Sequence, residues 1–372
     1  MKTVPESNYQ PSVIYHQFEF MIETNLLPGR TIITEGKEQL YFSGTSYLGI
    51  HKNVIFQELL RDGFSWYGTG YSSSRASNVQ LAIYEEAESW LADFAAAPVA
   101  LTFSSGYLAG QALIRTLDKG QQFLYAPQAH PALWRNEKDN VQGQYGKWVS
   151  SLVAKVGYSE REVVIVINSV DPLYARPHSF DWVTHLPDHL NITLVIDDSH
   201  GLGVLGEQGE GIFATVNRLI PSNVSLVVVG SIGKALGVTA GVVLGNNLII
   251  QQLKKSPYFT AASPAIPAYL YAMLRAEKLY AILLAQLRDN VQHFQSLIQD
   301  SDMFRYFENY PVFYSSDKNL CQELSEECVL SSFPYPNPDS DCITRVVISA
   351  LHTERDIDTL GKLVREYAVV KS

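Results

Sequence analysis

The 372-residue sequence has few cysteines, and none of its apolar runs is long. Cys321, Cys328 and Cys342 form no CxxC pair, so they indicate neither a disulfide framework nor a structural zinc site. No apolar run reaches the roughly 18 residues of a membrane-spanning helix. The opening segment, MKTVPESNYQPS, lacks the apolar stretch of a signal peptide. These absences predict a reduced protein of the cytoplasm with no membrane span.

Basic residues are also scarce relative to acids. The sequence has 28 Lys and Arg against 38 Asp and Glu, a formal charge of −10, which argues against binding of nucleic acid. Hydrophobic residues make up 46% of the chain and charged residues 18%, a composition that excludes a disordered protein. At about 100–200 residues per domain, the chain can form a large buried core.

Short, continuous runs of β-branched residues predict the central sheet. They lie at residues 163–167, 192–196, 226–229 and 241–244. Continuous runs are typical of parallel strands that helices cover on both faces. Apolar residues spaced by three and four predict helices over residues 81–94 and 274–291. Strands that alternate with helices indicate an α/β fold.

The two ends of the chain differ from its middle. The C-terminal part is rich in helical patterns and offers short strands at 312–314 and 344–349, followed by a helix over 354–369. We therefore predict a large, mostly parallel α/β domain over residues 50–260. A smaller α+β domain is predicted from residues 1–49 and 261–372.

Two glycine-rich motifs resemble nucleotide sites but lack the required context. Residues 201–206, GLGVLG, match GxGxxG, but four polar residues separate them from the preceding strand and EQGEG follows where a helix should begin. Residues 230–235, GSIGKA, resemble a P-loop, but the glycines are too close together and Ala235 replaces the required Ser or Thr. We interpret neither as a nucleotide site.

Polar residues at strand ends form another pattern. Lys234 closely follows a buried strand, and a lysine in partly dry surroundings can form a Schiff base, although a surface lysine is the alternative. Asp197 and His200 follow another strand, where an acid can pair with a heterocycle nitrogen and a histidine with a ring oxygen. The alternative is that Asp197 and Asp198 simply end the strand and form a solvated turn.

A phosphate-binding helix start is predicted within residues 103–108, where a strand, a small-residue turn and a helical pattern follow one another. A helix capped by Ser104 or Ser105 explains the same pattern without a ligand. His130, taken alone, is more typical of a packed or surface histidine. Together, however, the phosphate cradle, a ring stacker, an acid, a ring-oxygen donor and a lysine occur in the order expected for pyridoxal 5′-phosphate.

The sequence resembles the α-oxoamine synthases, a family of pyridoxal-phosphate enzymes in the fold-type I (aspartate aminotransferase) superfamily. The family includes 8-amino-7-oxononanoate synthase and 2-amino-3-ketobutyrate CoA ligase. The resemblance spans nearly the whole chain and rests on six motifs: SYLGI (46–50), YGTGYSSSR (67–75), FSSGYLAGQALI (103–114), IDDSHGLGVLGEQGEGI (196–212), GSIGKALG (230–237) and RVVISALHTERDID (345–358).

The resemblance implies a role for each residue around the cofactor ring. Lys234 would attach the cofactor covalently, and Asp197 would keep the pyridinium nitrogen protonated so that the ring acts as an electron sink. His200 would hydrogen-bond the phenolic oxygen, and His130 would stack on the ring. No metal ion is implied.

The resemblance also implies the phosphate and substrate contacts. The amides of Gly106 and Tyr107 and the Ser231 hydroxyl would hold the phosphate, together with Thr260 from a second subunit of a homodimer. The alternative for Thr260 is a cap on a helix that begins near residue 263. Arg345 would bind the carboxylate of the amino-acid substrate through a bidentate fork.

Three departures from the family pattern lie on the substrate side. The family's Asn-Asp-Tyr reads Thr45-Ser46-Tyr47 here, which removes a polar contact near the amino acid. Asn168 replaces a Glu and is closer to the residue that aminotransferases carry beside the cofactor oxygen. Residues 172–175, PLYA, replace Ser-Met-Asp-Gly.

We therefore predict a cofactor-dependent acyltransferase similar to 8-amino-7-oxononanoate synthase. It would condense an amino acid with an acyl-CoA or acyl-carrier thioester, with decarboxylation. The alternatives are an aminotransferase of the same fold, which Asn168 favours, and a non-catalytic relative, which the intact set of Lys234, Asp197 and His200 disfavours.

Overall fold

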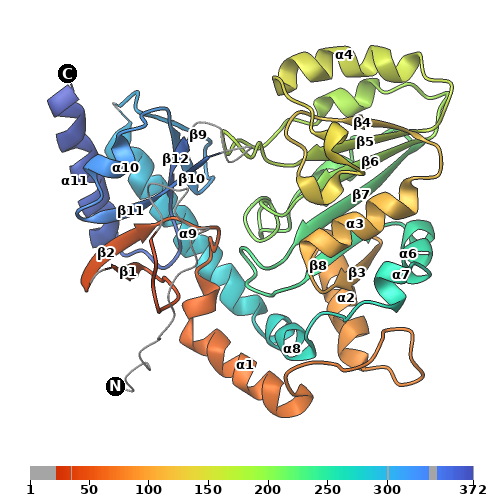
Figure 1. Ribbon diagram of the computed structural model, residues 1–372, viewed down its shortest axis with the longest axis horizontal. Helices are drawn as coiled ribbons and strands as arrows, with labels where there is room; N and C mark the ends of the chain where they lie inside the picture. The colour runs from red at the N-terminus through yellow and green to blue at the C-terminus, as the bar shows by residue number, and fades with distance from the viewer. Residues whose placement is uncertain (1–21, 35, 300, 335–341, 372) are drawn as a thin grey trace.

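The computed structural model describes residues 22–34, 36–299, 301–334 and 342–371, which form two six-stranded sheets with flanking helices (Figure 1). The larger sheet has the strand order β3-β8-β7-β6-β5-β4. Its strands are β3 (Val99–Phe103), β4 (Gln122–Tyr125), β5 (Val163–Asn168), β6 (Ile192–Asp197), β7 (Val224–Ser231) and β8 (Gly241–Gly245). The predicted α/β class is confirmed.

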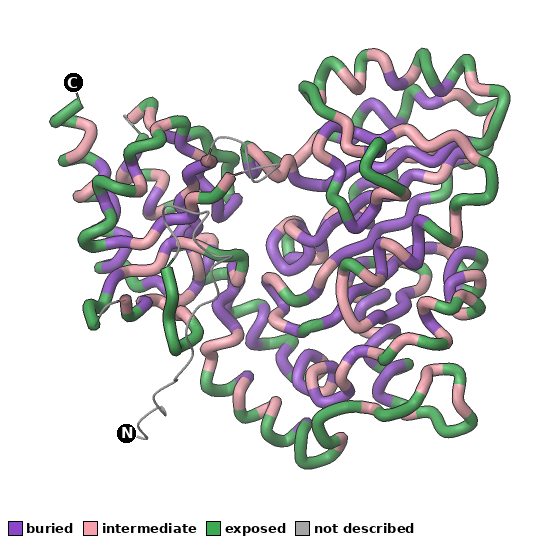
Figure 2. The backbone as a smooth tube through the Cα atoms, in the orientation of Figure 1, coloured by how far each residue is buried: buried purple, intermediate pink, exposed green. Residues whose placement is uncertain are grey.

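The larger sheet is mostly parallel, as predicted. β4, β5, β6 and β7 pair in parallel, whereas β8 is antiparallel to both β7 and β3. Every residue of β5 and β8 is buried, because helices cover both faces of the sheet (Figure 2). This burial explains why the strands consist of continuous β-branched runs rather than alternating polar and apolar residues.

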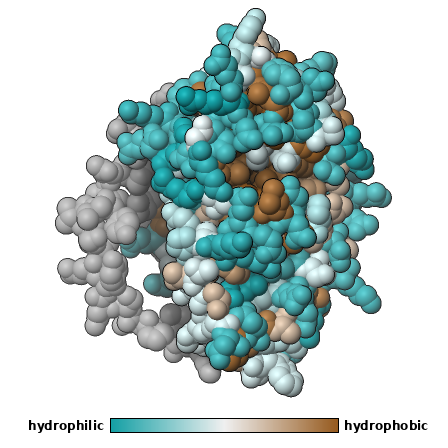
Figure 3. All heavy atoms as spheres, turned by 90° about the vertical axis from the view of Figure 1, so that its right-hand side faces the viewer, coloured by the Kyte–Doolittle hydropathy of each residue, from teal (hydrophilic) through white to brown (hydrophobic). Residues whose placement is uncertain are grey.

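Helices from the middle of the chain surround this sheet (Figure 1). They are α1 (Val54–Tyr67), α2 (Ala82–Ala95), α3 (Gly106–Leu117), α4 (Tyr145–Gly157), α5 (Phe213–Asn217), α6 (Asn247–Lys254), α7 (Pro257–Thr260) and α8 (Pro267–Arg275). Short 3₁₀ turns lie at Ile50–Lys52, Pro131–Leu133, Glu137–Asp139 and Asp181–His185. On the side turned away from the small sheet, hydrophilic side chains predominate, with apolar patches between them (Figure 3).

One predicted helix proves to be two. The apolar spacing over residues 274–291 predicts a continuous helix, but the chain leaves the helical conformation at Ala276, which separates α8 from α9 (Glu277–Ile298). Ala276 is fully buried, and its φ and ψ of −94° and 6° turn the chain. The apolar spacing continues across this turn because both helices pack on the same core. α8 packs on α1 and α2, and α9 leads on to the smaller sheet (Figure 1).

The smaller sheet combines the two ends of the chain in the order β1-β2-β11-β12-β10-β9. Its strands are β1 (Thr31–Thr34), β2 (Lys37–Phe42), β9 (Phe304–Tyr306), β10 (Val312–Ser315), β11 (Cys328–Pro334) and β12 (Cys342–Val347). Helices α10 (Leu320–Glu323) and α11 (Glu354–Lys371) accompany it. All its strands lie outside residues 50–260, whereas all strands of the larger sheet lie inside; the domain limits themselves remain predictions.

The two sheets meet where β6 and β7 end. The loop after β6 carries His200, whose ring lies 2.8 Å from the hydroxyl of Tyr47 and whose carbonyl accepts a hydrogen bond from Tyr310. These tyrosines precede the 3₁₀ turn at residue 50 and strand β10, so both ends of the chain reach the rim of the larger sheet. Among the described helices, none combines the length and apolar content needed to cross a bilayer.

Candidate active site

Lys234 and His200 lie in direct contact at the ends of two neighbouring strands. Lys234 Nζ is 2.8 Å from His200 Nε2, and Tyr47 Oη is 2.8 Å from His200 Nδ1. A protonated lysine can only donate, so His200 Nε2 then accepts and its Nδ1–H donates to Tyr47. The three side chains therefore form a hydrogen-bonded row that runs from the larger sheet to the N-terminal part of the chain.

Burial controls the protonation of this row. Desolvation lowers the pKa of Lys234 to about 8, although the nearby carboxylate of Asp197 opposes the shift. Burial also lowers the pKa of His200 well below its ordinary value, and the positive charges of Lys234 and Arg345 add to this shift. His200 is therefore neutral, and about a tenth of Lys234 is an unprotonated amine at pH 7, far more than of an ordinary lysine. An amine in this state is a nucleophile.

Asp197 and His130 form the second part of the group. Asp197 Oδ2 is 3.8 Å from His130 Nδ1, and Asp197 Oδ1 accepts a hydrogen bond from the amide of Ser199 at 2.9 Å. Asn168 fixes the other side: its Oδ1 accepts from the His130 amide at 3.1 Å, and its Nδ2 donates to the Gln128 carbonyl at 2.8 Å. The side chain of His130 remains 48% exposed, so the ring keeps a free face on which a planar ligand can stack.

The two adjacent acids, Asp197 and Asp198, point in different directions. Asp198 is completely buried, and its Oδ2 accepts a hydrogen bond from the Ile212 amide at 2.8 Å, away from His130. Burial raises the pKa of Asp198 to about 7, although the hydrogen bond from the Ile212 amide favours the charged form. Asp198 thus closes the loop 198–212, whereas Asp197 faces the candidate site. A solvated turn, the alternative interpretation of this pair, is wrong because both acids are buried.

The start of α3 is pressed against the end of β7. Ser105 caps α3 by accepting from the Leu108 amide at 3.1 Å, so the capped helix expected from the sequence is present. A Cβ on Gly106 would come within 2.7 Å of the Ser231 Cβ, so only glycine permits this approach. The first amides of a helix have no partner within it. Gly106 and Tyr107 therefore offer two donors beside the Ser231 hydroxyl.

Thr260 does not join this group within the described part of the chain. Its hydroxyl donates to the Ser256 carbonyl at 3.1 Å, and its own carbonyl accepts from the Ser74 hydroxyl. The interpretation of Thr260 as the cap of a helix starting near residue 263 is wrong: α7 ends at Thr260, and α8 begins only at Pro267. The predicted contact with a second subunit remains a prediction.

Arg345 lies in β12 and borders a cavity of about 280 Å³. The same cavity is lined by Thr45, Tyr47 and His200, so it adjoins the hydrogen-bonded row that ends at Lys234. Arg345 Nη2 donates to the carbonyls of Pro172 and, at 3.2 Å, Leu173. The segment that replaces Ser-Met-Asp-Gly thus holds the arginine through its backbone. Most of the remaining lining is apolar and includes Val170, Ala175, Val312, Phe333 and Val347.

Three residues of the candidate site were not predicted from the sequence. Tyr47 lies in the SYLGI motif, which could have singled it out, but its contact with His200 spans 153 residues. Ser199 joins two strand ends by accepting from the Ser231 amide at 2.8 Å. Tyr310 reaches the His200 carbonyl at 3.3 Å, and burial raises its pKa well above the ordinary value. No sequence signal marks Tyr310.

The two glycine-rich motifs do not form nucleotide sites of the usual kind. Residues 201–211 form consecutive turns, and the next helix, α5, begins only at Phe213. Residues 232–240 likewise turn back on themselves, with the Val238 amide donating to the Ile232 carbonyl at 3.0 Å, and lead into β8 rather than a helix. Neither motif therefore leads directly from a strand into a helix, which is the arrangement that such nucleotide sites need.

Comparison with known proteins places this geometry in context. Two curated relatives, the 8-amino-7-oxononanoate synthases of Petrotoga mobilis and Dechloromonas aromatica, are each 28% identical to the chain. The first match covers 89% of this chain and 88% of the relative, and the second covers 91% and 92%.

Solved structures agree on the fold. Serine palmitoyltransferase of Sphingomonas wittichii superimposes with a TM-score of 0.79 at 18% identity, over 92% of this chain and 90% of that one. The 8-amino-7-oxononanoate synthase of Francisella tularensis gives 0.70 at 21% identity, over 90% and 98%. The family model described as aminotransferase class I and II matches residues 173–362, which is just over half of the sequence. The chain therefore belongs to the aminotransferase class I and II family.

Proposed function

We propose that this chain is a pyridoxal-phosphate-dependent acyltransferase that condenses an amino acid with an acyl thioester and releases carbon dioxide. The observation that carries the proposal is the joined group of Lys234, His200, Asp197 and His130, with Arg345 at the adjoining cavity. The curated relatives at 28% identity, both 8-amino-7-oxononanoate synthases, support the same reaction class.

The donor set of the site fits pyridoxal phosphate. Lys234 supplies an amine of lowered pKa, Asp197 a buried carboxylate, and His130 a half-exposed ring. The start of α3, pressed against Ser231, supplies amides for a phosphate. When bound, the cofactor would draw electrons from the α-carbon of the amino acid. A serine palmitoyltransferase of S. paucimobilis with the same fold, at a TM-score of 0.79, was solved with PLP–myriocin bound.

The chain's own residues would bind and orient the substrates. Arg345 would hold the amino-acid carboxylate at the cavity of about 280 Å³. Lys234, as an unprotonated amine, would take and return the proton at the α-carbon, and neutral His200 would keep the lysine in place. A second cavity of about 900 Å³ shares Asp171 with the first and is bordered by Arg176 and Arg305, which suits an anionic acyl thioester.

An aminotransferase is the second candidate, and Asn168 is the residue that favours it. In the structure, the Asn168 amide binds the backbone at His130 and Gln128. This arrangement supports a role of Asn168 in positioning His130. A contact between Asn168 and the cofactor oxygen stays a prediction. An aminotransferase needs no acyl thioester, so this reaction would not explain the cavity of about 900 Å³.

A panel of incubations tests the proposed reaction. The chain, reconstituted with pyridoxal phosphate, is given one amino acid at a time, with either an acyl-CoA or a 2-oxo acid. Carbon dioxide release that requires the acyl-CoA supports the acyltransferase, whereas amino transfer to the 2-oxo acid without carbon dioxide release supports the aminotransferase. Failure to bind the cofactor at all would support the non-catalytic relative. Lys234→Ala is the matched control for each reaction.

We also propose that the chain acts as a homodimer in the cytoplasm. Trp66, Val79 and Tyr107 are more than half exposed, and Ser74 on the same loop as Val79 contacts Thr260. A second subunit would cover these apolar side chains and bring Thr260 to its phosphate. Sedimentation over a dilution series tests this proposal: a monomer that retains full cofactor occupancy would contradict it.

A further inference from the structure

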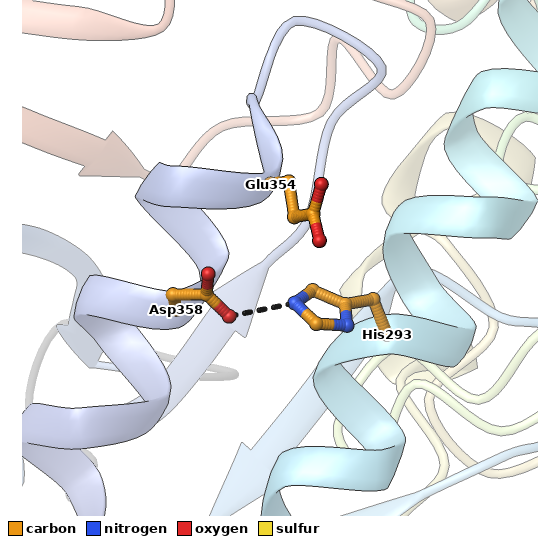
Figure 4. Close-up of side chains that lie close together, drawn as sticks. All are labelled: His293, Glu354 and Asp358. Carbon is orange, nitrogen blue, oxygen red and sulfur yellow. Dashed lines mark hydrogen bonds and ion pairs between the residues drawn. The ribbon is translucent and has the colours of Figure 1, made fainter.

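A histidine and two carboxylates gather where α9 meets the start of α11 (Figure 4). His293 belongs to α9, and Glu354 and Asp358 belong to α11. One ligand atom from each side chain, an imidazole nitrogen and two carboxylate oxygens, lies within 4.8 Å of the others. The proposed catalytic reaction uses none of the three.

The two helices hold this group in place. Glu354 and Asp358 are four residues apart, so they lie on the same face of α11. Gly361 lies farther along α11, where a Cβ would come within 2.7 Å of Leu297 Cδ1 on α9. The missing side chain lets the helices pack closely. Backbone packing, rather than the surface side chains, therefore sets the separation of His293 from the two acids.

One of the two carboxylates in this group is unpaired within the described part of the chain. His293 Nε2 is 2.8 Å from Asp358 Oδ1, but Glu354 has no hydrogen-bond or ion-pair partner among the described residues. The other acid in the first turn, Asp356, is engaged differently: it binds Arg30 at 2.5 Å and accepts from the Thr353 amide at 2.7 Å. The helix dipole favours an acid at this end, whereas like charges four residues apart repel each other.

We propose that His293, Glu354 and Asp358 bind a divalent transition-metal ion, of which zinc is the best fit. One imidazole nitrogen and two carboxylate oxygens form a set of ligands that zinc accepts, with water in the fourth position. Ligand atoms in a tetrahedral zinc site lie about 3.3 Å apart, so the present group needs only small side-chain rotations to close on the ion. Magnesium and calcium require more oxygen ligands and do not favour imidazole.

The bound ion would link α11 to α9. An ion that binds only the native chain would stabilise it by RT ln(1 + L/Kd), where L is the concentration of free metal, so the free energy of unfolding rises with that concentration. The link would oppose local unfolding of the first turns of α11, because two of the three ligands lie there.

Zinc titration of the untagged full-length chain, freed of metal with a chelator and then dialysed, tests the site. We expect one zinc ion per wild-type chain, and binding at least about tenfold weaker in His293→Gln, Glu354→Gln and Asp358→Asn. Glu366→Gln, two turns farther along α11, and His185→Gln, an exposed histidine elsewhere, are matched controls that should bind as the wild type does. Cobalt(II) should give an intense visible spectrum typical of four-coordinate ions, also lost in His293→Gln.

Hydrogen exchange gives a second readout, independent of activity. Zinc should slow amide exchange in residues 353–358 of the wild type and of Glu366→Gln but leave His293→Gln unchanged. Circular dichroism in the presence of chelator checks that each variant folds, which the surface position of both acids favours. The proposal is overturned by wild-type affinity in His293→Gln, by equal loss in His185→Gln, by calcium binding as tightly as zinc, or by no saturable zinc binding.

Discussion

The candidate active site has two sides, contributed by different sheets. On the larger-sheet side, the polar groups of Lys234, Asp197 and His200 are all hydrogen-bonded or paired at the ends of β6 and β7. On the smaller-sheet side, Arg345 borders a mostly apolar cavity and is held by backbone carbonyls. One side is arranged for chemistry on a fixed group, and the other leaves room for a variable one. Variants on each side should therefore fail in different ways.

The largest effect is expected at Lys234. Lys234→Ala removes the amine of lowered pKa and should reduce turnover by at least about 10³-fold, as expected when both covalent attachment and proton transfer are lost. Borohydride reduction followed by peptide mass spectrometry should locate the cofactor on Lys234 in the wild type. Lys255→Ala, at an exposed lysine, is the control. Cofactor fixed to the Lys234→Ala chain would disprove the assignment.

Asp197→Asn should come next, with turnover lower by about 10²- to 10⁴-fold. A neutral amide cannot keep a ring nitrogen protonated, whereas the amides at the start of α3 are unchanged, so the cofactor dissociation constant should move little. Steady-state kinetics and a cofactor titration measure the two quantities. Equal losses of binding and turnover would instead indicate that Asp197 has a structural role on the larger-sheet side.

Arg345→Lys tests the smaller-sheet side. Lysine keeps the charge but loses the bidentate fork, so KM for the amino acid should rise about 10- to 100-fold. Cofactor affinity and the visible spectrum should stay as in the wild type, because Arg345 belongs to the cavity and not to the Lys234–His200 pair. An unchanged KM with weakened cofactor binding would reverse the division between the two sides.

The smallest effect is expected at Asp198, on stability rather than on turnover. Its pKa is raised to about 7 in the folded chain, above the unfolded value, so the folded state holds the extra proton and stability declines as pH rises from about 4 to 7. Asp198→Asn can still accept from the Ile212 amide. When chemical unfolding is measured at pH 5 and pH 8, the free energy of unfolding should fall less between the two in Asp198→Asn than in the wild type. Turnover should stay near that of the wild type. A pH dependence identical to that of the wild type would show that Asp198 is not the titrating group.

The sequence predicts the larger-sheet side well, because its information is local. Asp197 and His200 follow one apolar run and Lys234 follows another, and parallel strands bring their carboxyl ends to one edge. The opposing directions of Asp197 and Asp198 were not predictable, because the turn that buries Asp198 depends on the amide of Ile212, fourteen residues away.

The smaller-sheet side depends on contacts between distant residues. Tyr47 meets His200 across 153 residues, and Arg345 meets Leu173 across 172. No periodicity within a short window carries such information. The break at Ala276 escaped for a related reason: the apolar spacing on its two sides is continuous, and only the surrounding core reveals the turn.

The pairing of β2 with β11 has a consequence for biosynthesis. Leu40 and Cys328 are partners in this ladder, so the first strands of the chain leave the ribosome long before the strand that completes their sheet. At roughly 5–20 residues per second, the wait lasts from about a quarter of a minute to a minute. During that time the edge of β2 is an unpaired template for other chains. The nascent chain is therefore a natural client for chaperones, and slow translation would lengthen its exposure to aggregation.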